Sequence, residues 1–163
     1  MASSIPDTAP STAASWADFT AAEPGLAATV EARFGAYTHH TLATLRKDGS
    51  PRTTGIEVRF LDGDLWLGMM PGSLKALDLR RDPRLALHSP TFDPPQGDES
   101  GWAGDAKVAG RAVETSKGNA PSGGHRFRID ILEMVLTRVG DPADHLVIES
   151  WHPDRGLETR RRA

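Results

Sequence analysis

The chain has 163 residues, no cysteine and a formal net charge of −3 at pH 7. A chain of this length forms one domain with a sizeable core, and without cysteine it has neither disulfides nor a thiolate nucleophile. We expect no nucleic-acid or membrane partner, because each requires a concentrated basic surface. The sequence lacks a run of eighteen apolar residues and a signal-peptide pattern, so we expect a cytoplasmic protein.

The N-terminal segment, residues 1–14, is rich in Ser, Thr, Ala and Pro. Such a composition buries too little apolar surface to offset the entropy of ordering. We therefore expect a disordered tail followed by one domain over residues 15–163. Ser15 is placed to cap a short helical turn, and Pro24 to open a second helix. Three apolar residues fall on one face of that second helix: Leu26, Val30 and Phe34.

Three strands are predicted next, over residues 37–46, 52–61 and 64–70. The dipeptides Asp48-Gly49 and Asp62-Gly63 separate them, and Asp-Gly is a strong hairpin signal. The middle strand alternates in polarity. Its inward-facing side chains are predicted to be Thr54, Ile56, Val58 and Phe60.

A strand, a turn, a helix start and a further strand follow one another over residues 64–89. Pro71-Gly72 ends the first strand, and Ser73 is a natural N-cap for a short helix. The start of a helix offers unpaired N–H groups and partial positive charge, and Lys75 lies in its first turn. The pattern is typical of a phosphate site, although a capping serine beside a solvated lysine is the ordinary alternative. Two leucines are expected to bury one side of this helix: Leu74 and Leu77.

The second half of the chain continues the strand pattern. Further strands are predicted over residues 84–89, 105–115, 126–139 and 145–151. A long surface loop rich in Pro, Gly and acidic residues covers residues 89–104, and residues 116–124 form a flexible connection. The apolar phase changes near Ile131-Leu132, which predicts a bulge or bend. The closing basic run is expected to be a solvated tail: Arg160, Arg161 and Arg162.

Together these elements predict an all-β dominated fold, a six-stranded antiparallel Greek-key barrel with a few short helices. No glycine-rich dinucleotide motif occurs, which disfavours a Rossmann fold. The six histidines show no metal-ligand spacing, and the adjacent His39 and His40 point to opposite faces of a strand. We therefore predict no metal site.

Four short motifs occur in a specific order: Leu42-Ala43-Thr44, Asp48-Gly49-Ser50-Pro51, Ser73-Leu74-Lys75 and Asp82-Pro83-Arg84-Leu85-Ala86-Leu87. Each is common by chance, whereas the ordered set is much more specific. In this order they resemble the flavin-binding proteins of the pyridoxamine 5'-phosphate oxidase-like superfamily, over roughly residues 37–151. The resemblance implies a split β-barrel that forms a homodimer, with two cofactor sites between the subunits.

The resemblance also implies a set of flavin contacts. The isoalloxazine ring would lie along Arg52, Thr53, Thr54, Gly55 and Ile56, with Gly68 and Met69 opposite. Ser73 and Lys75 would hold the phosphate. Trp151 would reach the cofactor or lie in an interface, and Arg160 would reach the cofactor or belong to the solvated tail. The family's oxidases have arginine where this chain has Leu74, and their C-terminal Arg-x-His motif is absent here. Both differences argue against pyridoxamine phosphate as the substrate.

These observations favour a flavin-dependent oxidoreductase that acts on a small organic substrate. FMN is the predicted cofactor, and a deazaflavin coenzyme is the alternative. Because a flavin supplies the redox chemistry, no protein acid or base is obligatory, and we assign no catalytic residue. Asp78 and Asp82 are expected to face solvent and to pair with Arg81 or Arg84.

Two other classes of function stay open. One is a non-catalytic carrier of flavin or of haem, in which His39, His40 or His88 would be the haem ligand. The other is an assembly protein that uses only the dimeric barrel and binds no cofactor.

Overall fold

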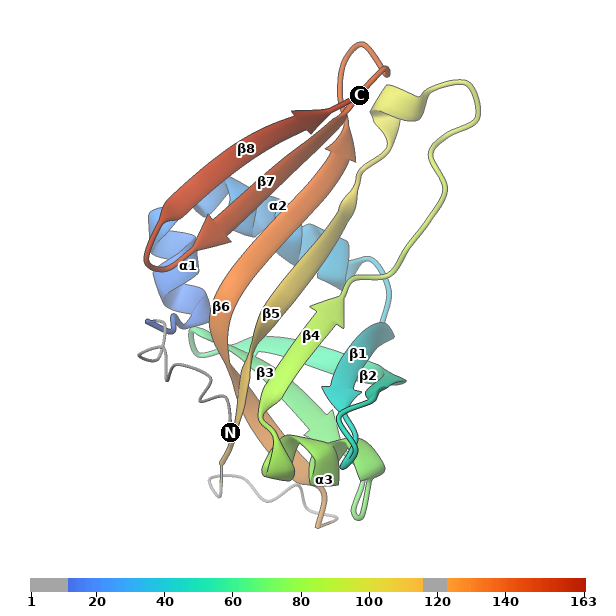
Figure 1. Ribbon diagram of the computed structural model, residues 1–163. Coiled ribbons are helices and arrows are strands. Elements are labelled where there is room, and N and C mark those ends of the chain that lie inside the picture. Colours follow the sequence, from blue (N-terminus) through green and yellow to red (C-terminus); the bar gives the residue numbers. More distant parts are fainter. Residues whose placement is uncertain (1–11, 116–122) are drawn as a thin grey trace, which may run out of the picture.

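The computed structural model describes residues 12–115 and 123–163. Eight antiparallel strands form one sheet in the order β3-β2-β1-β4-β5-β6-β7-β8, and a further pairing of β3 with β6 closes the first six into a barrel (Figure 1). The strands are β1 (His40–Leu45), β2 (Pro51–Leu61), β3 (Asp64–Met69), β4 (Arg84–His88), β5 (Asp105–Glu114), β6 (His125–Val139), β7 (Leu146–His152) and β8 (Gly156–Arg162). The prediction of a six-stranded antiparallel barrel with short helices is confirmed.

Strand β8 corrects the expectation of a solvated C-terminal tail. Gly156, with φ of 74°, forms the turn after β7, and β8 then pairs with β7 from Gly156 to Arg162. Its side chains are almost all exposed, so main-chain hydrogen bonds hold the strand and no apolar alternation marks it in the sequence. The β7–β8 hairpin therefore extends the sheet beyond the barrel (Figure 1).

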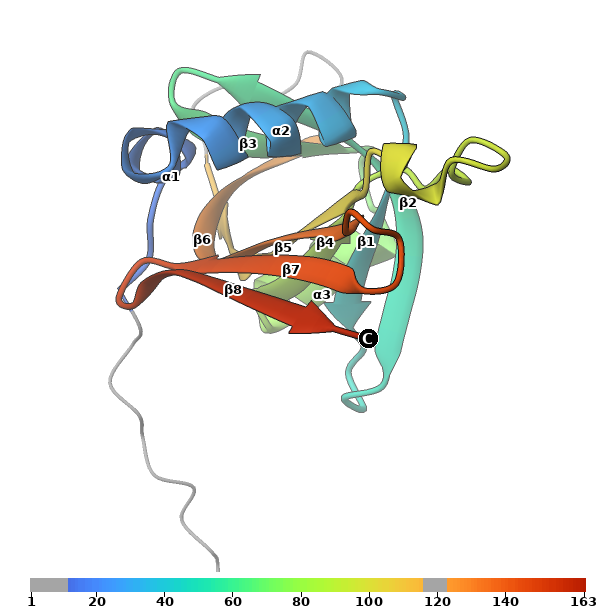
Figure 2. The same cartoon turned by 90° about the horizontal axis from the view of Figure 1, so that it is seen from above.

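Helices α1 (Trp16–Ala22) and α2 (Pro24–Gly35) lie across one side of the sheet (Figure 2). Ser15 caps α1 through a capping box: its hydroxyl accepts from the Asp18 N–H at 3.1 Å, and the Asp18 carboxylate accepts from the Ser15 N–H at 2.9 Å. Pro24 is the first residue of α2. Both predicted helices are confirmed, and their apolar faces are buried.

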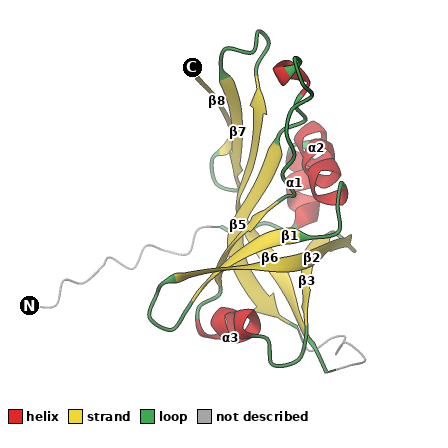
Figure 3. Cartoon of the chain, turned by 90° about the vertical axis from the view of Figure 1, so that its right-hand side faces the viewer, coloured by secondary structure: helices red, strands yellow, loops and turns green. Residues whose placement is uncertain are grey.

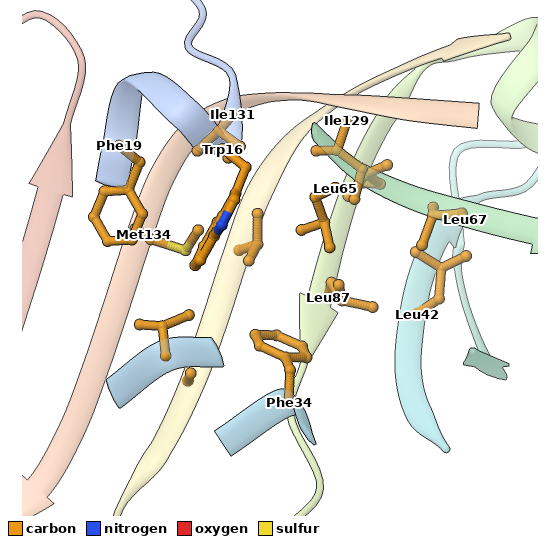
Figure 4. Packing of buried hydrophobic residues seen from close by; sticks show 14 of the residues in the cluster. Trp16, Phe19, Phe34, Leu42, Leu65, Leu67, Leu87, Ile129, Ile131 and Met134 are labelled. Carbon is orange, nitrogen blue, oxygen red and sulfur yellow. The ribbon is translucent and has the colours of Figure 1, made fainter. Parts of the chain in front are cut away.

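The core is a single cluster that joins the two helices to the barrel interior (Figure 4). Phe60 of β2 lies between Trp16 and Phe34, with ring centroids at 4.5 and 6.2 Å. Phe19 of α1 packs against Trp151 of β7 at 4.9 Å. These contacts attach the β7–β8 hairpin to α1 and hold it against the barrel.

One residue before the expected domain boundary at Ser15 already packs against the barrel. Ala14, which the sequence placed in the tail, is buried and exchanges two backbone hydrogen bonds with Ile131, at 2.9 and 2.8 Å. The expected disorder of residues 1–11 and the expected flexible connection at 116–122 lie outside the described residues.

The predicted irregularity in the long strand is confirmed. In β6 the buried positions change from odd to even numbers: Phe127, Ile129 and Ile131, then Met134 and Leu136. The pairing with β5 shifts between Ala109 and Gly110, so that Leu132 has no partner. A Cβ at Gly110 would collide with the carbonyl oxygen of Asp130, which explains why glycine faces this bulge.

Helix α3 (Leu74–Arg81) lies at one end of the barrel, away from α1 and α2 (Figure 3). The expected burial of Leu74 and Leu77 is wrong: they are 59% and 46% exposed. The buried residues are Ala76, Asp78 and Leu79 instead. Ala76 and Leu79 lie on the side of α3 that faces the end of the barrel, where they are in apolar contact. Asp78 lies on the same side and forms hydrogen bonds with Thr44 and Arg52. These contacts set the orientation of the helix and leave Leu74 and Leu77 exposed.

Candidate functional site

A groove of about 1030 Å³ runs over β2 and β3 to the start of α3. Six of the ten residues predicted to bind the cofactor line it: Gly55, Ile56, Gly68, Met69, Ser73 and Lys75. The groove also contains His39, which the sequence analysis considered only as a haem ligand, and residues that it did not select: Glu57, Arg59, Trp66, His125 and Arg126. The sequence therefore located the groove but only part of its wall.

Two glycines leave the strand backbone of the groove bare. Gly68 pairs with Glu57 across β2 and β3, and Gly55 lies two residues earlier on the same face of β2. No heavy atom beyond the chain neighbours lies within 4 Å of the position that a Cβ would take at either glycine. A flat ligand can therefore approach the main chain at both positions.

The start of α3 forms one end of the groove. Ser73 has an extended conformation, and its hydroxyl accepts a hydrogen bond from the Ala76 N–H at 3.3 Å. The Lys75 ammonium donates to the Gly55 carbonyl oxygen at 2.6 Å, and burial lowers the pKa of Lys75 from its ordinary value of 10.5. A hydroxyl, a cation and the N-terminal turn of a helix thus lie where the sequence predicted a phosphate site.

His125 of β6 contacts the turn that precedes Ser73. The Gly72 N–H donates to His125 Nε2 at 3.3 Å, and His125 Nδ1 lies 3.2 Å from the Glu114 carboxylate. The tautomer with the proton on Nδ1 satisfies both contacts. Two further bonds of 2.7 Å from Arg80 bind Glu114 to α3 and lower the pKa of Glu114, with burial opposing them. No sequence signal indicated this cluster, because its members come from α3, β5 and β6.

Arg52 points away from the groove toward a buried carboxylate. Asp78 accepts hydrogen bonds from Thr44 at 2.8 Å, from Arg52 at 2.7 Å and from Arg81 at 2.9 Å. The expectation that Asp78 faces solvent is wrong, since only 3% of the residue is exposed. Burial alone would raise the pKa of Asp78, but the bonds from Arg52, Arg81 and Thr44 outweigh it and lower the pKa below 3.8. Asp82 pairs with Arg84 at 2.7 Å, as expected.

The remaining predicted site residues are not in the groove wall. Thr53 is exposed on β2, and Thr54 points inward with its hydroxyl buried and without a hydrogen-bond partner among the described residues. Trp151 is 4% exposed and lies in the hydrophobic core beside Phe19. In this chain Trp151 therefore has a packing role.

The three histidines considered as haem ligands differ in their exposure and in the contacts of their ring nitrogens. Both ring nitrogens of the buried His40 lie near carbonyl oxygens, at 2.7 Å from Phe34 and 3.3 Å from Ile56. His88 lies 2.6 Å from the Ser89 carbonyl oxygen and 3.6 Å from Asp105. His39 is exposed in the groove, 3.7 Å from Glu57. Over residues 12–115 and 123–163, no three His, Asp or Glu side chains are grouped to hold a metal ion.

No protein-family model and no curated protein matches the chain, whereas solved structures do. PhzG from Burkholderia lata 383, in complex with tetrahydrophenazine-1-carboxylic acid, aligns with a TM-score of 0.62 and 12% identity over 88% of this chain and 90% of its own. A pyridoxamine 5'-phosphate oxidase-related, FMN-binding protein from Nostoc punctiforme PCC 73102 aligns with a TM-score of 0.61 and 12% identity, covering 86% and 97% of the two chains.

The chain shares the split-barrel fold of these two proteins, the second of which is related to pyridoxamine 5'-phosphate oxidase. A haem-binding protein from Mycobacterium smegmatis shares this fold with a TM-score of 0.51 and 15% identity, over 83% of this chain and 88% of its own. The split-barrel fold that the ordered motifs implied is therefore confirmed. Within the part of the chain that the structure describes, no helix is long and apolar enough to cross a membrane.

Proposed function

We propose that the chain binds FMN in the groove over β2 and β3 and acts as an oxidoreductase on a small organic substrate. One observation carries this proposal: the groove joins a helix start that carries a hydroxyl and a cation, Ser73 and Lys75, to a strip of backbone left bare by Gly55 and Gly68. FMN has the complementary parts, a phosphate and a planar ring system.

The residues present fit the cofactor at both ends. Lys75 is bonded to a neutral carbonyl oxygen of Gly55, so a phosphate can replace that partner with a stronger, charge-assisted one. The Ser73 hydroxyl oxygen accepts a hydrogen bond from the Ala76 N–H, and its proton can therefore be donated to a phosphate oxygen. A ring placed over Gly55 and Gly68 meets main chain and no side chain at these two positions.

The bound flavin would supply the redox chemistry, since it accepts and donates electron pairs as a hydride. The protein's own residues would orient it and restrict solvent around it. Ser73 and Lys75 hold the phosphate, Gly55 and Gly68 admit the ring, and Ile56 and Met69 supply apolar wall. Leu74 stands where the family's oxidases have arginine, so we propose a substrate other than pyridoxamine phosphate.

A deazaflavin coenzyme is the alternative cofactor. Like FMN, it has a planar ring system and a phosphate. The bare backbone at Gly55 and Gly68 and the start of α3 would therefore bind it in the same way. A direct comparison of the two cofactors distinguishes them.

We also propose that the chain forms a homodimer that covers the groove. Met70 is 80% exposed and Leu61 is 47% exposed, and both lie in the groove wall. Apolar side chains of this size on one face are typical of a surface that another molecule buries. Size-exclusion chromatography with light scattering gives the mass of the protein in solution. A monomer at micromolar concentration would contradict the proposed homodimer.

The experiment that tests the cofactor is a parallel titration of the purified protein with FMN, the deazaflavin coenzyme and haemin, followed by absorbance and fluorescence. We expect saturable micromolar binding of FMN. Tighter binding of the deazaflavin coenzyme would change the cofactor within the same proposal. Binding of haemin alone would support the haem carrier, with His39 as the groove's histidine, and binding of none would contradict the proposal.

A further inference from the structure

Two arginines lie in the groove at a distance from the proposed phosphate site. On the outer face of the sheet, Gly68 of β3 pairs with Arg126 of β6, and the neighbouring Trp66 pairs with Arg59 of β2. Arg59 lies four residues along β2 from Gly55, where Lys75 is bonded, which is about 13 Å of extended strand. The groove therefore has two separate cationic ends.

Arg126 is held in a defined orientation. Its guanidinium carbon lies 4.1 Å from the centre of the Trp66 ring, and Trp66 lies two residues from Gly68, the pairing partner of Arg126. The Trp66 ring is itself fixed, because its indole N–H donates to the Leu61 carbonyl oxygen at 3.1 Å. A guanidinium stacked on an indole keeps the N–H groups at its edge free to bind a carboxylate.

Within residues 12–115 and 123–163, neither arginine is neutralised by a carboxylate. Among the described residues, Arg59 and Arg126 form no ion pair, whereas the adjacent Arg128 is bonded to Asp130 at 3.1 Å. The described groove wall contains Arg59, Lys75 and Arg126 and one carboxylate, Glu57. Its charge is thus +2 with both histidines neutral, opposite in sign to the −3 of the whole chain.

We propose that Arg126, stacked on Trp66, together with Arg59 binds the carboxylate of a planar organic acid that is the substrate of this groove. A forked, pre-oriented guanidinium matches a carboxylate in two parallel hydrogen bonds, and the bare backbone at Gly68 admits a flat ring beside it. That the bound acid is a substrate rests on the proposed function, whereas binding of the acid needs no cofactor.

The test uses benzoate and its neutral analogue benzamide as probes. Their binding to the full chain is measured by calorimetry, with and without saturating FMN. We expect benzoate to bind at least tenfold more tightly than benzamide. The substitution Arg126→Gln should abolish this preference, and Arg59→Gln should reduce it. Arg128→Gln is the matched control, because Arg128 is already paired with Asp130, and it should leave the preference intact.

Equal binding of the two probes to the unaltered protein would overturn the proposal, as would a preference that survives Arg126→Gln. If that variant fails to fold, salt dependence in the unaltered protein decides. Benzoate binding must then weaken between 50 and 500 mM NaCl while benzamide binding does not, because salt screens a charge interaction. FMN binding is recorded separately, so loss of the proposed function and loss of the acid site give different results.

Phenyl phosphate is the third probe and distinguishes the two common oxyanions. Tighter binding of benzoate than of phenyl phosphate supports an organic acid. Clearly tighter binding of phenyl phosphate that is lost in Arg126→Gln, and so belongs to this end of the groove and not to Ser73 and Lys75, would contradict the assignment of a carboxylate.

Discussion

The ammonium of Lys75 and the carbonyl oxygen of Gly55 are joined by a hydrogen bond of 2.6 Å, which connects the first turn of α3 to the floor of the groove. The bond holds a cation beside the bare backbone of Gly55. In the proposed complex the phosphate would meet a lysine that this bond already orients, which reduces the cost of ordering on binding.

Replacing Lys75 by alanine should weaken FMN binding about 10- to 100-fold, because a hydrogen bond to a charged group is worth about 1.5–3 kcal/mol. Fluorescence titration measures the change. Lys107→Ala is the control, since Lys107 is exposed on β5, outside the groove. Identical titration curves for Lys75→Ala and the unaltered protein would remove Lys75 from the site.

The affinity for FMN should fall at alkaline pH. Burial lowers the pKa of Lys75 from 10.5, so the free protein loses this cation at a lower pH than an exposed lysine would. A bound phosphate favours the charged form, and binding therefore weakens as the pH rises through that lowered pKa. Titrations between pH 7 and pH 10 should show this decline, and the decline should be absent in Lys75→Ala.

Replacing Asp78 by asparagine should reduce the free energy of unfolding by about 3 kcal/mol. This is the lower end of the range for a broken buried pair, because Arg81 remains 38% exposed and can be solvated. Urea unfolding measures the loss. Asp82→Asn, which affects a more exposed pair with Arg84, should cost no more than about 1 kcal/mol.

The same aspartate should contribute to acid sensitivity. Its pKa is lower in the folded protein than 3.8, so below that pH the unfolded chain takes up the proton first. The stabilisation is complete above pH 3.8 and is lost as the pH falls through the folded pKa. The slope of stability against pH in this acid range should be shallower in Asp78→Asn, and an unchanged slope would assign the acid sensitivity to other carboxylates.

Replacing His125 by alanine should weaken FMN binding roughly 2- to 10-fold, the value of one ordinary hydrogen bond. The change leaves the Gly72 N–H without its acceptor and frees the turn before Ser73. His125→Gln places an acceptor near the former Nε2 and should restore part of the affinity. Equal affinities for alanine and glutamine variants would show that the bond to Gly72 does not position the turn.

Replacing Trp151 by alanine should lower the free energy of unfolding by about 3–5 kcal/mol, the usual cost of removing a large core aromatic side chain. Trp151→Phe keeps most of the packing against Phe19 and should bind FMN with unchanged affinity. A clear loss of FMN affinity in a stable Trp151→Phe protein would support the direct cofactor contact that the family resemblance implied.

Local signals in the sequence predicted most of the barrel. Asp-Gly turns located β2 and β3, Ser73 located the start of α3, and the apolar phase change near Ile131 located the bulge in β6. Each of these features is decided within a few neighbouring residues. Local signals also indicated Ser73 and Lys75 as a phosphate site, whereas Gly55 entered the candidate site through the family resemblance.

What the sequence did not predict depends on partners that lie far apart in the chain. The orientation of α3 is set by the pairing of Asp78 with Thr44 and Arg52. His125 and Arg126 enter the groove only because β6 closes the barrel against β3. Strand β8 is held by main-chain bonds to β7, which no side-chain pattern reveals.

The bulge in β6 determines which deletions and insertions in this strand the fold can tolerate. The first part of β6 pairs with β3 and closes the barrel, while the last part pairs with β7 and supports the outer hairpin. The extra residue near Leu132 keeps both parts facing the same core. Deleting Leu132 would remove the bulge and leave a regular alternation, in which Met134 and Leu136 still face inward. Deleting Val135 instead, beyond the bulge, would turn Leu136 outward and Thr137 inward. Away from the bulge, only changes of two residues therefore preserve the core.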